Sequence, residues 1–386
     1  MAREHFLNPF AKQKKRRDSR ELQQQGSDED EPLVRERTLR VASSHSGAAL
    51  SQRRRHQISA AILFLVGVSV GFVLAWRASP DRRMGSSSAM HVLRRVPSDP
   101  FLLRVMTFNL RYGSSKGGPA SWPERRRHVA DVIAHYHPLL VGTQEGLPAQ
   151  LQELQDSLPP TYARVGEPRE PGGEHAQIFY DSSVVELRDA GTFWLSETPT
   201  TPYSKGWDAK YPRVATWGLF RLRATGLQLV AVNTHLDARG EASRREGVAT
   251  IWTEMKAVLQ AHSLSLADTP LFLTGDFNTD RSSAVYSFLT RDGDGPRLQD
   301  AWLTAEHRVG SVLNTYHDWL GPAFDATPNG TARPNAPPHE LHLDWILARP
   351  AVPVVLAEII TESRDGHYPS DHYPVVAEFL VPSPTS

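Results

Sequence analysis

The amino-acid sequence predicts an α/β protein in which layers of strands and helices pack together. The 386 residues are 40 % apolar and 22 % charged, which is the ordinary composition of a globular protein. From residue 101 to about residue 380, apolar runs of strand length recur between longer segments that have helical spacing. This mixture favours a two-layer α/β sandwich over a single parallel sheet.

The predicted elements follow in order from residue 102. The first strand, Leu102–Asn109, is a short apolar run, and the first helix, Trp122–Tyr136, has apolar residues at helical spacing after Pro123. The remaining strands are apolar runs at Leu139–Glu145, Ala176–Tyr180, Ala215–Arg223, Leu227–His235, Leu271–Gly275, Asp344–Ala348, Val352–Thr361 and Val375–Phe379. The remaining helices are Gln150–Leu158, Glu241–His262 and Ser283–Leu289. We therefore expect one folded domain over residues 101–382.

Charge and cysteine content exclude several functions. The formal net charge is zero, so binding of a polyanion would need a local patch rather than a basic surface. The chain contains no cysteine, which excludes disulfides, thiolate metal sites and a cysteine nucleophile.

Residues 1–57 are predicted to form a disordered tail. They carry basic and acidic runs such as Lys14–Arg17 and Asp28–Glu31, with few aromatic residues and no sustained periodicity. Such a segment buries too little apolar surface to offset the entropy lost on ordering. A solvated tail fits these runs better than a nuclear localisation signal, which is the alternative.

Residues 58–76 are predicted to form a transmembrane helix, followed by a linker over residues 77–100. The segment reads ISAAILFLVGVSVGFVLAW and carries no charge. At 1.5 Å per residue it would be roughly 28 Å long, about the thickness of the hydrocarbon core of a bilayer. A buried core helix is disfavoured because the polar flanks offer nothing to pack against, and a cleavable signal peptide would start nearer the N-terminus.

The orientation of this anchor is predicted from charge. Three arginines lie on each flank: Arg53–Arg55 before the segment, and Arg77, Arg82 and Arg83 after it. The positive-inside rule, which places the more basic flank in the cytoplasm, therefore favours neither orientation. The wider tail is basic, which favours a cytoplasmic N-terminus and a lumenal or extracellular catalytic domain. The glycosylation sequon Asn329–Thr331 is consistent with that side.

Polar side chains follow the predicted strands at the points where their apolar runs stop. Acids, amides and imidazoles occupy these positions: Asn109, Glu145, His235, Asp276, Asn278, Asp371 and His372, while Asp344 begins a strand. A single acid or amide at a strand end is more often a turn residue, but strand ends that share one sheet edge converge on one cleft. Carboxylate and amide oxygens suit Mg²⁺ or Mn²⁺, although zinc on His235 and His372 is an alternative.

The order of these motifs resembles the endonuclease/exonuclease/phosphatase superfamily. TFN, QE, NTHLD, GDFN, LDWI and SDHYPV occur in that order from about Val105 to Phe379, so the resemblance covers nearly all of the globular region. It implies a four-layer α/β sandwich of two packed mixed sheets flanked by helices. It also implies metal-dependent hydrolysis of a phosphoester bond by in-line attack of water.

The resemblance implies a role for each matching residue. Glu145 would be the principal Mg²⁺ ligand, with Asn109 beside it and Asp371 completing the metal shell. Asp276 and Asn278 would orient or deprotonate the attacking water. His235 and His372 would contact the scissile phosphate, oriented by Glu174 and Asp344 respectively, and Arg213 would bind phosphate. Arg111 departs from the pattern, because some relatives have an acid there as a second metal ligand.

Several substrate classes remain open. GDFN followed by Thr279, together with the segments Gly191–Pro199 and Gly206–Ala209, resembles the nuclease and deadenylase (nocturnin-like) branches more than the inositol-phosphate phosphatases. This favours a 3′–5′ exonuclease acting on RNA, or a nucleotide phosphatase. The aromatic residues Trp194, Tyr203, Trp207 and Tyr211 would stack on a base or serve as ordinary core and loop residues. The alternatives are a sphingomyelinase-like enzyme acting on lipid headgroups, which the anchor favours, and an inactive membrane-anchored scaffold. The sequence does not indicate an oligomeric state.

Overall fold

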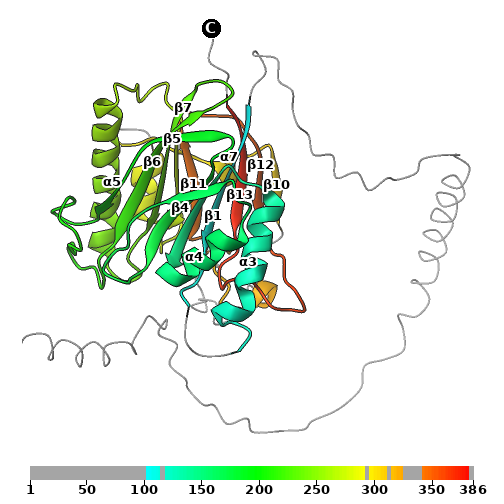
Figure 1. Cartoon of the computed structure of the whole chain (residues 1–386). Helices are drawn as coiled ribbons and strands as arrows, with labels where there is room; N and C mark the ends of the chain where they lie inside the picture. Colours follow the sequence, from blue (N-terminus) through cyan, green and yellow to red (C-terminus); the bar gives the residue numbers. More distant parts are fainter. Residues whose placement is uncertain (1–100, 114–117, 292–294, 311–313, 325–340, 382–386) are drawn as a thin grey trace, which may run out of the picture. The chain divides into compact units, whose positions relative to one another are not determined.

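Two packed β-sheets form the centre of the domain (Figure 1). The computed structural model describes residues 101–113, 118–291, 295–310, 314–324 and 341–381. The first sheet has the order β10 (His307–Val309), β12 (Val354–Ile359), β13 (Val375–Val381), β1 (Phe101–Asn109), β2 (Leu140–Gly146), β4 (His175–Asp181) and β3 (Tyr162–Val165). The second has the order β5 (Val185–Trp194), β6 (Val214–Leu222), β7 (Gln228–His235), β8 (Leu271–Asp276), β11 (Asp344–Arg349) and β9 (Gln299–Asp300). Both sheets are mixed, since β1–β2 and β7–β8 are parallel and most other pairs are antiparallel.

Helices cover the outer face of each sheet and complete four layers. Helices α3 (Trp122–Tyr136) and α4 (Pro148–Ser157) pack on the first sheet, and α5 (Glu241–Ala261) and α6 (Ala284–Thr290) pack on the second. A short α7 (Ala301–Thr304) and the 3₁₀ turn η3 (Gly321–Ala323) lie in the connections. Helix α3 starts with proline in its first turn and ends where His137 takes a left-handed backbone conformation.

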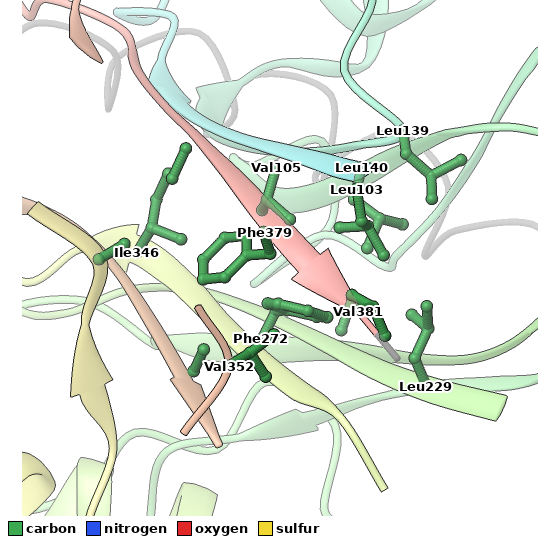
Figure 2. Packing of buried hydrophobic residues seen from close by; sticks show 14 of the residues in the cluster. Leu103, Val105, Leu139, Leu140, Leu229, Phe272, Ile346, Val352, Phe379 and Val381 are labelled. Atoms are coloured by element: carbon green, nitrogen blue, oxygen red, sulfur yellow. The ribbon is translucent and has the colours of Figure 1, made fainter. Parts of the chain in front are cut away.

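The strands alternate their side chains between two cores. In β1, Leu103 and Val105 pack between the sheets, while Met106 and Phe108 pack against the helices. Figure 2 shows the inter-sheet core, where Phe272 and Phe379 from opposite sheets meet edge to face with ring centroids 4.9 Å apart. Every second residue of a central strand therefore points into the space between the sheets.

Toward one end of the strands this inter-sheet space becomes polar. The amide nitrogen of Gln144 donates to Asn233 Oδ1 (2.7 Å), and Thr274 Oγ1 donates to the same oxygen (3.1 Å). The Asn233 amide nitrogen donates in turn to the carbonyl oxygen of Thr143 (2.8 Å). Gly142 lies directly against this network, where a Cβ would collide with the Thr274 hydroxyl group. These contacts hold the two sheets at a fixed separation beside the residues that follow.

Most of the predicted strands and helices are present, with ends shifted by a few residues. The strands divide between two packed sheets covered by helices, as the family resemblance implied, rather than forming the two-layer sandwich that the apolar pattern alone favoured. The strands β3, β5, β9 and β10 and the short helix α7 were not predicted. In β5 the charged residues Glu186, Arg188 and Asp189, and a register shift after Leu187, interrupt the alternation that marks a strand.

The predicted tail (1–57), transmembrane segment (58–76) and linker (77–100) lie outside the described residues. Within the described residues, no helix has the length and apolar character needed to cross a bilayer. The anchor and its orientation therefore stay predictions.

Candidate active site

Strand register places three polar side chains next to one another at one end of the second sheet. Asp276 ends β8 and pairs with His235, at the end of the parallel strand β7, and with Asp344, at the start of the antiparallel strand β11. All three residues are buried, with exposed fractions of 9 % or less. Their side chains belong to the same row of alternate residues in each strand that fills the space between the sheets.

At the matching end of the first sheet, Asn109 and Glu145 close the cluster. The amide nitrogen of Asn109 donates to Glu145 Oε1 (3.0 Å) and to Asp276 Oδ2 (3.0 Å), so one side chain joins the two sheets. The backbone N–H of Tyr112 donates to Glu145 Oε2 (2.9 Å). Burial opposes ionisation of Glu145, but the charge of Arg111 and these hydrogen bonds outweigh it and hold the pKa of Glu145 below its usual range.

Three residues of this region have left-handed backbone conformations. The φ angles are 53° at Arg111, 62° at Glu145 and 49° at Asn278. Such angles are costly for residues other than glycine, and they persist where surrounding contacts fix them. Asn278 is fixed by its backbone N–H, which donates to Asp276 Oδ1 (2.9 Å). Strained backbone thus supports the carboxylates of both sheets.

His372 forms a pair with Asp344 and is cationic at neutral pH. Its Nδ1 lies 2.8 Å from Asp344 Oδ2, and its Nε2 lies 3.8 Å from Asp276 Oδ2. Burial disfavours the imidazolium, but the carboxylates of Asp344 and Asp276 raise the pKa of His372 to about 10. Burial, together with the negative charge of Asp344, raises the pKa of Asp276 above its usual range.

His235 lies on the other side of Asp276 and is neutral. Its Nε2 lies 2.9 Å from the amide nitrogen of Asn278, which also donates to the carbonyl oxygen of Leu236 (3.0 Å). Both amide protons of Asn278 are used in this way, so His235 Nε2 is the acceptor and the ring proton is on Nδ1. Burial and the positive charge of Arg213 lower the pKa of His235 well below its usual value.

Asp371 reaches the cluster from the loop before β13. The hydroxyl group of Ser370 donates to the carbonyl oxygen of Asn109 (2.7 Å) and ties this loop to the end of β1. Asp371 Oδ2 lies 3.4 Å from Arg111 Nε. Eight of the ten predicted site residues therefore come together at one end of the two sheets: Asn109, Glu145, His235, Asp276, Asn278, Asp344, Asp371 and His372.

Glu174 and Arg213, the other two, lie in a neighbouring cluster beside His235. Glu174 Oε2 is 3.9 Å from His235 Nδ1, beyond hydrogen-bond distance, and accepts instead from Arg169 Nη1 (3.0 Å). Arg213 is buried, and its Nε lies 3.4 Å from Asp237 Oδ2. Glu174 is therefore next to His235, as expected, but no hydrogen bond joins the two side chains.

Arg169 and Asp237 were missed as site residues in the sequence. Asp237 follows His235 by two residues and belongs to the NTHLD motif, so strand-end position was a usable signal. Arg169 is a single arginine in a loop, which has no distinguishing pattern. Of the predicted stacking aromatics, Trp194 is buried and its Nε1 donates to the carbonyl oxygen of Arg169 (2.8 Å), while Tyr203 is exposed.

The donors at this end of the sheets suit a divalent cation. Within the described residues, the ligand atoms of Asp276, Asp344 and His372 lie within 4.8 Å of one another. The Nδ1 of His372 is already paired with Asp344, so only its Nε2 faces Asp276. Glu145 and Asp371 instead present carboxylate oxygens on either side of Arg111, and such oxygens are the ligands that Mg²⁺ and Mn²⁺ prefer.

The two packed sheets, with acids, amides and imidazoles gathered at one end, are the fold and site of a phosphoesterase. The chain belongs to the endonuclease/exonuclease/phosphatase family, whose sequence model matches residues 106–372. Comparison with curated proteins gave no significant match.

Solved structures agree with this assignment. A family member from Bacteroides vulgatus is 33 % identical and matches 73 % of this chain and 99 % of its own, with a TM-score of 0.63. A mannosyl-6-phosphatase from Bacteroides thetaiotaomicron is 30 % identical over 72 % of this chain and 99 % of its own, with a TM-score of 0.60. The human Nocturnin catalytic domain with bound sulfate is 22 % identical, covers 72 % of this chain and 93 % of its own, and has a TM-score of 0.53; it shares the fold.

Proposed function

We propose that the chain is a Mg²⁺-dependent hydrolase of phosphoesters that works by in-line attack of water. The observation that carries this proposal is the position of Asp276. Its Oδ2 accepts a hydrogen bond from Asn109 and lies 3.5 Å from His235 Nε2 and 3.8 Å from His372 Nε2. A single carboxylate thus stands between a carboxylate pair suited to a metal and two imidazoles suited to a phosphate.

Glu145, Asp371 and Asn109 are the residues that would hold the ion. When bound, Mg²⁺ stabilises negative charge on phosphoryl oxygens and lowers the pKa of water. The backbone N–H of Tyr112 and the Asn109 amide fix Glu145 as an ionised carboxylate. Mn²⁺ fits the same oxygen donors, whereas zinc favours nitrogen and sulfur ligands, which Glu145, Asp371 and Asn109 do not offer.

Asp276 is the proposed acceptor for the proton of the attacking water. Its raised pKa is closer to neutral pH, which makes its carboxylate a stronger base than an ordinary surface carboxylate. The backbone N–H of Asn278 holds one of its oxygens, and Asn109 holds the other. The geometry therefore leaves Asp276 in one orientation for the water.

The two histidines have different proposed roles because their charges differ. The cationic His372 stabilises the charge that builds on the phosphoryl oxygens and can donate its Nε2 proton to the leaving group, while Asp344 fixes the ring. The neutral His235 can donate its Nδ1 proton, which is on the side of Glu174, without carrying a charge. Arg213 and Glu174 act next to His235, with Arg169 holding the Glu174 carboxylate.

A small phosphomonoester, such as a sugar phosphate or a nucleotide, is the proposed substrate class. The relative of 30 % identity that carries an activity in its name is a mannosyl-6-phosphatase, which supports a phosphomonoester. The burial of Trp194 also removes one aromatic residue from the predicted base-stacking surface. A nuclease acting on RNA is the second candidate, supported by the motif GDFN followed by Thr279.

The full chain should be offered mannose 6-phosphate, AMP, oligo(A) and sphingomyelin in parallel, with Mg²⁺ or with EDTA. We expect Mg²⁺-dependent release of inorganic phosphate from a monoester, lost in Glu145→Gln and retained in Glu254→Gln on helix α5. Trimming of oligo(A) alone would favour the nuclease, and headgroup release alone would favour a lipid substrate. Hydrolysis that is equal in EDTA, or that persists in Glu145→Gln, would overturn the proposal.

We also propose that residues 58–76 anchor the chain in a membrane with the catalytic domain on the lumenal or extracellular side. The uncharged apolar run and its arginine flanks support this. Protease treatment of sealed microsomes should leave the catalytic domain intact until detergent is added. Complete digestion without detergent would contradict the orientation.

A further inference from the structure

Arg111 touches all three residues that the proposed function assigns to the metal. Its backbone N–H donates to Asn109 Oδ1 (2.9 Å). Its guanidinium Nε lies 3.4 Å from Asp371 Oδ2, and its Nη1 lies 3.9 Å from Glu145 Oε2. The family resemblance gives Arg111 no role. It marks Arg111 only as a departure from the acid that some relatives have two residues after the first asparagine.

The backbone of Arg111 is held in this position from both sides. Its carbonyl oxygen accepts hydrogen bonds from Arg125 Nη2 (2.6 Å) and from the amide nitrogen of Gln150 (3.0 Å). Together with the N–H bond to Asn109, these contacts stabilise its φ angle of 53°. The backbone from which the guanidinium extends is therefore fixed by the fold.

The guanidinium lies over the Tyr112 ring, 4.7 Å from its centroid, and the side chain is 27 % exposed. Neither carboxylate is close enough to form a short charge-assisted hydrogen bond with it. Arginine keeps its charge at any physiological pH. The site thus contains a permanent cation that balances Glu145 and Asp371 without occupying all of their lone pairs.

Charge balance gives this arrangement a consequence. The guanidinium of Arg111 already supplies a positive charge between the carboxylates of Glu145 and Asp371, 3.9 Å and 3.4 Å from their oxygens. A second divalent cation bound between the same carboxylates would lie next to this guanidinium, and repulsion between like charges is strong at low dielectric.

We propose that Arg111 takes the place of a second metal ion and limits the site to one divalent cation. This inference rests on the proposed function, since it assumes that Glu145 and Asp371 hold the first ion. If Arg111 were replaced by aspartate, three carboxylates would meet at one place with no cation between them. Binding of a second ion is then the way to restore the charge balance.

The test is the number of Mn²⁺ ions bound by the full chain, measured by equilibrium dialysis or titration calorimetry. We expect one ion per chain in the wild type and in Arg111→Lys, which keeps the charge, and two in Arg111→Asp. Arg111→Met keeps the side-chain stem over Tyr112 but removes the charge, and its thermal unfolding reports whether the fold persists.

The outcomes separate this inference from the proposed function. A wild type that binds two ions, or a folded Arg111→Asp that binds one, would overturn the role of Arg111 and leave the metal site in place. A wild type that binds no Mn²⁺, or whose ion is retained in Glu145→Gln, would overturn the proposed metal ligands as well.

Discussion

At the scale of the residue, the charge of His372 depends on Asp344. Replacing Asp344 by asparagine keeps the volume of the side chain but removes the negative charge that opposes burial of the imidazolium. We expect Asp344→Asn to lower kcat by about 10²-fold or more, the size of effect that a positioned acid–base group usually contributes. The change in KM should be small, because the metal ligands are untouched.

The matched control is another acid–imidazole pair of the same chain, on the surface. Asp189 Oδ2 lies 3.0 Å from His262 Nε2 at the end of helix α5, and both side chains are partly exposed. Asp189→Asn should leave turnover unchanged. A normal kcat in Asp344→Asn would mean that the cationic form of His372 is not required.

The site residues differ in how far the sequence could reveal them. Asp276 and Asp344 could be predicted because each lies at the end of an apolar strand, and register then places them side by side. The position of Glu174 could not, because its distance from His235 depends on Arg169, which competes for the same carboxylate oxygen from a loop. Which of two side chains binds a shared carboxylate oxygen depends on the folded positions of all three residues, which the sequence pattern does not contain.

At the scale of the element, Gly142 in β2 is a position that admits no side chain. An added Cβ would overlap the Thr274 hydroxyl group and lie 2.5 Å from Asn233 Oδ1, so Gly142→Ala must displace the inter-sheet polar network. We expect a loss of about 1–3 kcal/mol in the free energy of unfolding, measured by denaturant titration. Turnover should fall too, because the network adjoins Glu145 and His235.

Gly247 in helix α5 provides the opposite expectation. A Cβ there would make an ordinary contact of 3.4 Å with Leu195 Cδ1. Alanine in place of glycine within a helix stabilises it by about 0.5–1 kcal/mol. If both variants changed stability in the same direction, the tight inter-sheet contact at Gly142 would not be the cause.

The same polar network explains which elements the sequence predicts well. Central strands such as β1, β7 and β8 are apolar on both faces, so they are evident as continuous apolar runs. Because both faces are apolar, however, the runs do not indicate which strands share a sheet. The edge strand β5 carries exposed charges and a bulge, and these remove its alternating pattern.

At the scale of the whole molecule, the fold buries histidines that the unfolded chain leaves free to ionise. His317 is 1 % exposed, its ring stacks on Tyr373 with centroids 4.0 Å apart, and its Nδ1 accepts from the backbone N–H of Gly321 (3.2 Å). Burial, with a smaller contribution from the positive charge of His372, lowers the pKa of His317 to about 3. Folding therefore keeps this ring neutral over a wide range of pH.

The sign of the resulting pH dependence follows from the two states. Below about pH 6.5 the unfolded chain binds a proton at His317 that the folded chain does not bind until about pH 3, so acid stabilises the unfolded state. Between pH 6 and pH 4 this one group should lower the free energy of unfolding by about 1.4 kcal/mol per pH unit.

His317→Asn removes the titrating ring and retains an acceptor for Gly321, so its unfolding free energy should fall less steeply with acid by that amount. Urea titrations of both proteins at several pH values measure the two slopes directly, whatever the variant loses in overall stability. Equal slopes would mean that His317 is protonated in the folded protein or that the ring is accessible to water.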